Sequence, residues 1–195
     1  MAFTKEQVIA QAITIVGGPP INAIVDGEEF SEAASLGYDL LYDSLLSSHR
    51  WRLATKIVPL SKSVVNPIID LWKFSYILPS DYLTLDRLHP NVQHQIFGDK
   101  LFTNKDNVDS DLIIEYRFST PVEKLPTYYI RFLVYSLAHH LALGVAQKFQ
   151  YVAELERMMD SARAAALFND SQSSGNVEIQ NNPFVFTNTF NNRIR

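Results

Sequence analysis

Residues 129–141 read YIRFLVYSLAHHL, and this stretch decides which kind of fold the chain can adopt. Apolar side chains recur there at intervals of three and four residues, and further apolar residues fill most of the remaining circumference of a helix. A helix that is apolar nearly all round lies among other helices or is shared with a neighbouring subunit. We therefore expect a central helix here, and the rest of the chain should supply its neighbours.

Three further segments predict amphipathic helices. Thr4-Lys5-Glu6-Gln7 is a capping box, and Gly17-Gly18-Pro19-Pro20 ends the helix that it begins. A second helix is expected over about 30–48, with a buried face of Ala34, Tyr38, Leu41 and Leu45 that is widened by Leu36, Leu40 and Leu46. A fourth is expected over about 151–168, with a buried face of Val152, Leu155, Met159, Ala162 and Ala166.

Between the second and third helices the period of the pattern changes to two. Leu53, Thr55 and Ile57 alternate with polar residues and predict a strand with one buried face. Further strands are expected at Phe74–Leu78 and at Leu112–Phe118. His94–Phe97 and Lys100–Thr103 flank Gly98-Asp99, a pair that supports a two-residue hairpin turn. This region predicts four or five strands.

The fold class that follows is mainly α. Residues 1–50 and 119–168 should form an antiparallel bundle of about four helices, and residues 51–118 a small antiparallel β subdomain inserted into it. Residues 169–195 should form an extended C-terminal tail, because a linker-like composition gives way to an alternating segment with nothing local to pair with. The tail residues expected to contact a neighbouring subunit or another protein are Phe184, Val185, Phe186, Phe190, Arg193 and Arg195.

Composition excludes several classes of protein. The chain has 195 residues, a net charge of −4 and no cysteine, which argues against a dedicated nucleic-acid binder and excludes disulfides and thiolate chemistry. The N-terminus lacks the apolar core of a signal peptide, and Phe132–Ala146 is too short to span a bilayer. We expect a soluble protein that is made in a cytoplasm and has no contact with a membrane.

No motif in the sequence points to a reaction. The histidines (His49, His89, His94, His139 and His140) lack metal-ligand spacing, and Asp106, Asp109 and Asp111 lack the pattern of a calcium loop. Arg50-Trp51-Arg52 alone interleaves aromatic and basic residues as a base-stacking surface would, and a core or subunit contact is the better interpretation of the aromatic residues. We therefore expect no catalytic residue, no metal, no cofactor and no enzymatic activity.

The order of several short motifs resembles a known family. Ile15–Ile21 ends an apolar helix in Gly-Gly-Pro-Pro-Ile, Arg50-Trp51 closes the second helix before a strand, and Phe74–Leu85 reads FSYILPSDYLTL. Further along are Ile114 and Tyr116, Leu125-Pro126 followed by Tyr129, and Leu137-Ala138. Taken in this order over residues 4–168, they are similar to the head-to-tail adaptors of podoviruses, of the tail tubular protein A type.

The resemblance implies a structural connector at the head–tail junction of a virion, assembled in the cytoplasm of the host. It implies a homo-oligomeric, dodecameric ring that binds the portal protein on one side and a tail nozzle or tail tube protein on the other. Genomic DNA would pass through the central channel without sequence-specific binding. Two other hypotheses stay open: a virion-associated cell-wall hydrolase carried at the same junction, and a nucleic-acid-binding module.

Overall fold

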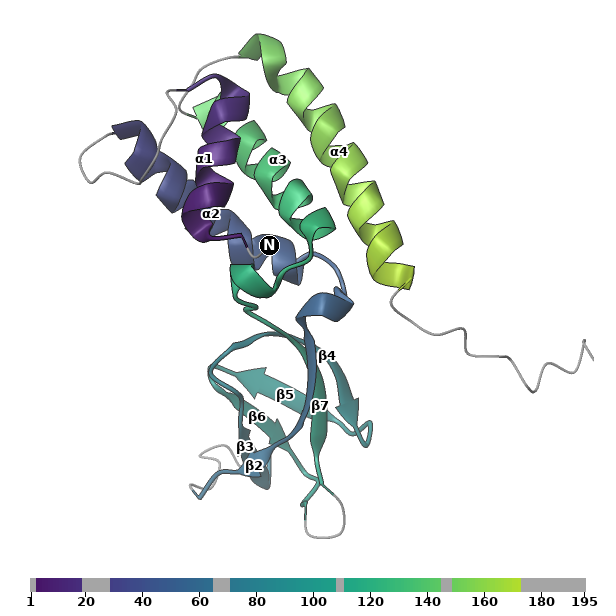
Figure 1. Cartoon of the computed structure of the whole chain (residues 1–195). Helices are drawn as coiled ribbons and strands as arrows, with labels where there is room; N and C mark the ends of the chain where they lie inside the picture. Colours follow the sequence, from purple (N-terminus) through teal and green to yellow (C-terminus); the bar gives the residue numbers. More distant parts are fainter. Residues whose placement is uncertain (1–2, 19–28, 65–70, 108–110, 145–148, 173–195) are drawn as a thin grey trace, which may run out of the picture.

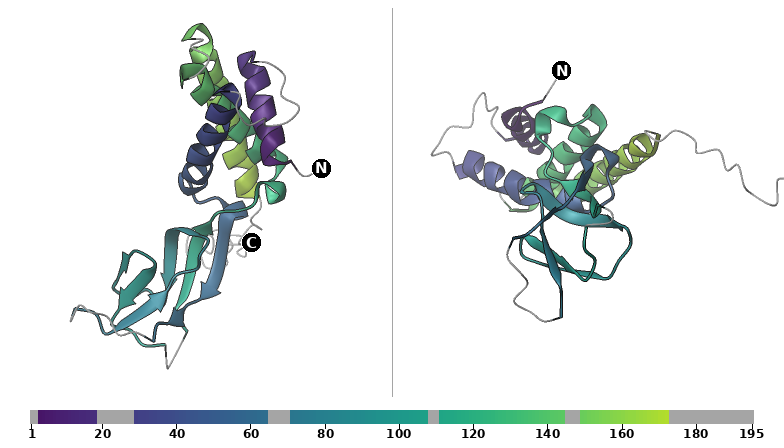
Figure 2. Two further views of the ribbon diagram at one scale, coloured as in Figure 1. Left: turned by 90° about the vertical axis from the view of Figure 1, so that its left-hand side faces the viewer. Right: turned by 90° about the horizontal axis from the view of Figure 1, so that it is seen from below.

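The structure is a computed structural model that describes residues 3–18, 29–64, 71–107, 111–144 and 149–172. Four helices lie at one end of the molecule: α1 (Lys5–Val16), α2 (Glu29–Ser47), α3 (Thr127–Gly144) and α4 (Phe149–Gln172). The strands lie at the other end, and the two halves together give an elongated shape (Figures 1 and 2). Of the helices described, none has both the length and the apolar character that a membrane span requires.

The helical half forms around α3, as residues 129–141 predict. α3 contacts each of the other three helices, and its residues Leu133, Leu137 and Leu141 are fully buried. The capping box of α1 is present, since Thr4 accepts a hydrogen bond from Gln7 N and Gln7 Oε1 accepts one from Thr4 N at 3.1 Å. Gly17 ends α1 in the left-handed region, at a φ of 75°, which glycine adopts without strain.

The β half contains two antiparallel sheets. The first has three strands in the order β1 (Thr55–Pro59), β7 (Ile113–Phe118) and β4 (Tyr82–His89). The second has four, in the order β2 (Ser61–Lys62), β3 (Phe74–Ile77), β6 (Lys100–Thr103) and β5 (His94–Phe97). A separate apolar core includes Tyr76, Leu101 and Ile114, which are fully buried. Short 3-10 helices, η1 (Arg52–Ala54) and η2 (Val122–Lys124), join the halves.

The prediction of a mainly α fold with a small β insertion is wrong. The described residues form four helices and seven strands in two sheets, which is a mixed α and β architecture with a second core of its own. The sequence pattern understates the β half because neither the short β2 nor β4 is predicted as a strand. The register of β4 against β7 shifts twice, between Tyr82 and Thr84 and between Leu85 and Arg87, and each shift breaks the alternation that identifies a strand.

Two predicted buried faces also differ from those observed. Leu36 and Leu40 do not widen the buried face of α2, because 65% and 69% of their surfaces are exposed. In β1 the side chain of Ile57 is 68% exposed, and the inward face carries Val58, which packs against the β core. The expected hairpin between β5 and β6 is confirmed, with Phe97 paired to Lys100 across the turn.

The C-terminal helix is longer than its sequence pattern indicates. α4 was expected to end near Phe168 and continues to Gln172. Asp170, which the composition places in a linker, is buried in the last turn of α4 and accepts a hydrogen bond from Arg52 N at 3.0 Å. The tail positions expected to make contacts, Phe184, Val185, Phe186, Phe190, Arg193 and Arg195, lie outside the described residues.

Candidate functional site

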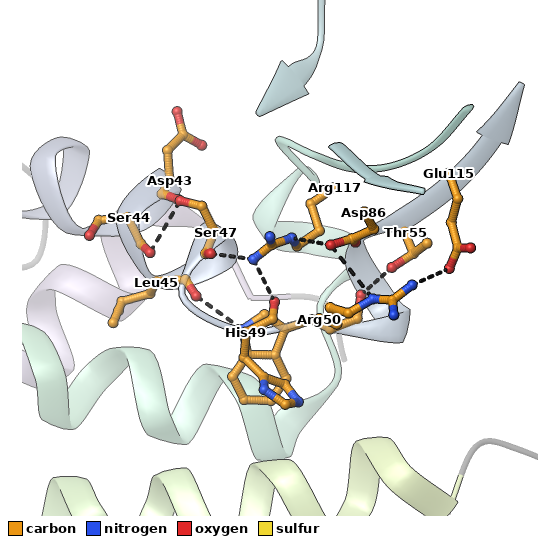
Figure 3. Close-up of polar contacts among 11 residues, drawn as sticks. Asp43, Ser44, Leu45, Ser47, His49, Arg50, Thr55, Asp86, Glu115 and Arg117 are labelled. Carbon is orange, nitrogen blue, oxygen red and sulfur yellow. Dashed lines mark hydrogen bonds and ion pairs between the residues drawn. The ribbon is translucent and has the colours of Figure 1, made fainter. Parts of the chain in front are cut away.

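A network of charged side chains joins the helical half to the β half at the end of α2 (Figure 3). Arg117 of β7 donates from Nη1 to the carbonyl oxygens of Ser47 and His49, the second at 3.1 Å. The last carbonyls of a helix have no partner within the helix, and the helix dipole makes them a favourable place for a cation. The guanidinium of a strand residue therefore caps α2, which has no basic residue in its own last turn.

Asp86 of β4 neutralises this arginine. Its side chain is only 4% exposed, and Oδ1 lies 3.2 Å from Arg117 Nε and 3.6 Å from Arg50 Nε. Arg50 also reaches Glu115 of β7, at 3.1 Å between Nη2 and Oε1. Within the described residues neither Arg117 Nε nor Asp86 Oδ2 makes a hydrogen bond, so charge attraction holds this pair together. Two arginines and two carboxylates thus form one chain of ion pairs.

A cleft opens beside this network on the outer face of the three-stranded sheet. It has a volume of about 500 Å³ and is lined by Arg50, Arg52, Thr55, Ile57 and Glu115. The residues contributed by β1 alternate with those that point into the β core, so this side of β1 faces the cleft. Arg52 Nη1 also donates to Ser171 O at 3.2 Å, which places the end of α4 at the mouth of the cleft.

A smaller, mostly apolar cavity of about 330 Å³ lies in the helical half. The residues that line it come from α1, Gly17, α3 and α4: Ile15, Val16, Gly17, Ala142, Tyr151, Glu154, Leu155 and Met158. Glu154 supplies the one carboxylate in this set. Apolar walls with a single carboxylate suit an apolar side chain from another segment better than a reactive substrate.

The β half holds a second polar group around the turn that precedes β4. Asp81 accepts a hydrogen bond from Tyr116 Oη at 2.8 Å and forms an ion pair with Lys56. Burial alone would raise the pKa of Asp81, but the hydrogen bonds from Lys56 and Tyr116 outweigh it and hold that pKa below its usual range. Burial raises the pKa of the Tyr116 hydroxyl, which therefore stays protonated and donates. This group ties β1, β4 and β7 together.

The residues considered for chemistry in the sequence are dispersed in the structure. Trp51 is fully buried, and its ring contacts Tyr129 and Phe132, so it belongs to the helical core and offers no face for stacking a base. Asp106 pairs with Lys62 at 2.9 Å, and this hydrogen bond lowers the pKa of Asp106. Across the described part of the chain, no three histidine or acidic side chains come together to hold a metal ion.

His140 has a structural environment in the contact between α2 and α3. A Cβ built on Gly37 would lie 3.0 Å from His140 Cδ2, so a larger residue at position 37 would require the imidazole to shift by a few tenths of an ångström. His140 is exposed, and its ring lies against Gly37 at the edge of the contact between α2 and α3.

Sequence reasoning missed the ion-pair network and the cleft. The signal available was Arg50-Trp51-Arg52, two arginines on either side of a core tryptophan, but the carboxylates that pair with Arg50 come from β4 and β7, far along the chain. No family model matches this chain, and no curated protein matches its sequence.

Proposed function

We propose that this protein is a non-enzymatic structural subunit of the head-to-tail connector of a tailed phage. In this proposal it oligomerises into a ring between the portal protein and the tail nozzle or tail tube protein, and the ring leaves a channel for the genome. The observation that carries the proposal is the large amount of apolar surface that the subunit exposes on both of its halves. The order of motifs over residues 4–168 supports the particular assembly.

The clearest exposed apolar surface in the helical half lies on α2. Leu36 and Leu40 are one helical turn apart, so their side chains lie on the same face, and most of each side chain is exposed. Burying a leucine fully contributes roughly 1.5–3 kcal/mol. Adjacent exposed apolar residues on one helix face support a contact surface, since contiguous apolar patches mark interaction sites more often than single exposed residues do.

The β half exposes apolar residues of its own. Ile57 of β1 is mostly exposed, and Ile77 of β3 and Phe97 of β5 are about half exposed. An elongated subunit with apolar surface at both ends has separate places for separate partners (Figure 1). This arrangement suits a ring subunit that contacts copies of itself and two other components, since each contact needs about 1,000 Å² or more of buried surface.

The charge of the protein is consistent with a channel for DNA. Binding to DNA through its phosphates requires clustered lysine and arginine side chains that displace counterions. The net charge here is −4, and the arginines of the joint are neutralised by Asp86 and Glu115. A ring of such subunits would let a genome pass without holding it.

The proposal is tested with the full-length protein and the portal protein encoded in the same genome. The wild-type chain is expected to co-sediment with portal as a complex of several copies. L36Q/L40Q should fold normally and lose most of this association, because it removes the apolar stripe from α2. S44Q is the matched control, since Ser44 is an exposed polar residue one turn further along the same helix face.

Two results would overturn the proposal. One is a wild-type protein that stays monomeric and does not co-sediment with portal at any ratio. The other is a pair of findings. L36Q/L40Q assembles as well as S44Q, and substitutions at the exposed apolar residues of the β half leave portal binding unchanged. Circular dichroism and urea unfolding of each variant would separate lost assembly from lost folding.

A further inference from the structure

β1 is an edge strand with free hydrogen-bonding groups. The order β1–β7–β4 leaves one side of β1 without a described neighbour. Leu60 N donates to Leu112 O at 2.8 Å, which fixes the alternation of the ladder: the backbone groups of Lys56 and Val58 face β7. The N–H and C=O of Ile57 therefore face away from β7, toward open space.

The cleft beside the β1 edge has the features of a groove that could hold an extended segment. The side chains of Thr55 and Ile57 line the cleft of about 500 Å³, and Ile57 is largely exposed there. Edge strands of soluble proteins are usually protected by charges, by proline or by a covering segment. Pro59 protects one end of β1, but the exposed isoleucine at its centre favours pairing with another strand.

The described chain ends beside this groove. Ser171 O accepts a hydrogen bond from Arg52 Nη1, and Asp170 accepts from Arg52 N, so Gln172 lies next to the cleft that Arg52 lines. Residues 173–183 follow, and then Phe184-Val185-Phe186-Thr187-Asn188-Thr189-Phe190, an uncharged segment rich in residues that favour strands. An extended linker of this length spans at most about 40 Å, enough to reach a neighbouring subunit.

We propose that residues 184–190 of one subunit pair with the β1 edge of a second copy of this chain and fill its cleft. In a strand, Phe184, Phe186 and Phe190 share one face, which would cover Ile57. The other face would carry Val185 and Thr187. Backbone hydrogen bonds to Ile57 supply affinity, and the apolar face selects the register.

Assembly into a ring favours a second copy of this chain, and not the same chain, as the source of the segment that pairs with β1. In a ring each subunit gives one tail and receives one, so no edge remains open once the ring closes. If residues 184–190 paired with β1 of their own chain, neighbouring subunits would stay unconnected. The length of residues 173–183 would then serve no purpose in assembly. The inference rests on the proposed assembly into a ring and adds to it the segment that links neighbouring subunits.

The absence of cysteine from the chain makes disulfide trapping a direct test. Two full-length single-cysteine variants, I57C and F186C, are mixed and oxidised mildly, and the products are separated without reductant. The expected product is a covalent dimer of one chain of each kind, at least about tenfold more abundant than with L143C and F186C. Leu143 is the control, because it is exposed, lies in the last turn of α3 away from β1, and is not part of the proposed contact surface on α2.

A second pair of variants tests the backbone pairing itself. I57P removes the N–H that faces away from β7 and leaves the ladder between β1 and β7 intact, whereas I57T keeps the donor. I57P should lose self-association in sedimentation by at least about tenfold in affinity, and I57T should retain most of it.

Three outcomes would overturn the inference. They are no mixed dimer, an equal yield with L143C, or a disulfide that forms only within a single chain carrying both I57C and F186C. Portal binding of the same proteins separates the two proposals. Binding to portal without a mixed dimer would contradict the tail exchange alone, while a protein that neither assembles nor binds portal would contradict the proposed function.

Discussion

The helical half and the β half are stabilised in different ways. Among the described residues the helical core contains 24 buried apolar residues arranged around α3, and the β core contains eight. The β half compensates with polar ties, namely the ion pairs of Asp86 and the hydrogen bonds of Asp81. The comparison shows that a large apolar core forms one half, whereas the other depends on charged groups and on its attachment to the end of α2.

The largest effect is expected from breaking the joint between the halves. R117M leaves the buried Asp86 with only its longer ion pair to Arg50 and removes the cap of α2, and removing one partner of a buried ion pair costs about 3–5 kcal/mol. Urea unfolding should show a lower free energy of unfolding or a separate early transition of the β half.

The double variant R117M/D86L separates the causes of that loss. If the uncompensated charge dominates, the double variant should recover a large part of the stability lost in R117M. A loss of less than about 1 kcal/mol in R117M would contradict the role given to the joint.

The next largest effect distinguishes the two cores. L133A in α3 and L101A in β6 each remove a fully buried leucine, a change that costs about 2–5 kcal/mol. L133A should lower the stability of the whole molecule against urea, because α3 contacts every other helix. L101A should lower mainly the stability of the β half, which would appear as faster amide exchange in β3 and β6. Equal effects on both halves from both variants would show one cooperative unit.

A smaller effect is expected at the end of α4. D170A removes the carboxylate that accepts from Arg52 N and Leu53 N, and hydrogen bonds to a charged group contribute about 1.5–3 kcal/mol. D160A, at an exposed position of the same helix, is the control and should change stability by less than about 0.5 kcal/mol. Thermal unfolding of the two variants measures the difference, and equal melting temperatures would remove Asp170 from this role.

The smallest effect depends on pH. Because the folded pKa of Asp81 is lowered, its ionised form stabilises the fold above the usual aspartate pKa of about 3.9, and this contribution is lost as the pH falls through the folded pKa. D81N should lower the free energy of unfolding, measured in urea at pH 7, by about 1 kcal/mol or less and have little effect on it at pH 2. If D81N and wild type differed in free energy of unfolding by the same amount at pH 7 and pH 2, ionised Asp81 would not have this stabilising role.

Local signals predicted much of the helical half and one hairpin. The capping box at Thr4, the glycine that ends α1 and the turn at Gly98-Asp99 depend on a few adjacent residues, and each is found in the structure. β4 was not predicted because its bulges interrupt the period of two. The predicted fold class is wrong because the described β half has two sheets and a core of its own. The prediction lacked β4, which completes the three-stranded sheet, and the short β2.

The candidate site was largely beyond reach of the sequence. Pairing of Arg50 with Asp86 and Glu115 depends on where β4 and β7 lie relative to the end of α2, and no local pattern encodes that distance. The exposure of Leu36, Leu40 and Ile57 has a similar origin, because an apolar residue on a surface has the same sequence pattern as one in a core. Only the arrangement of elements distinguishes the two.

The decisive measurement is electron microscopy of the full-length protein mixed with the portal protein encoded in the same genome. If the chain is a connector subunit, averaged images should show a ring of its copies as an added layer at one end of the portal, around an open channel. Portal particles that look the same with and without the protein, at saturating concentration, would contradict the proposed function.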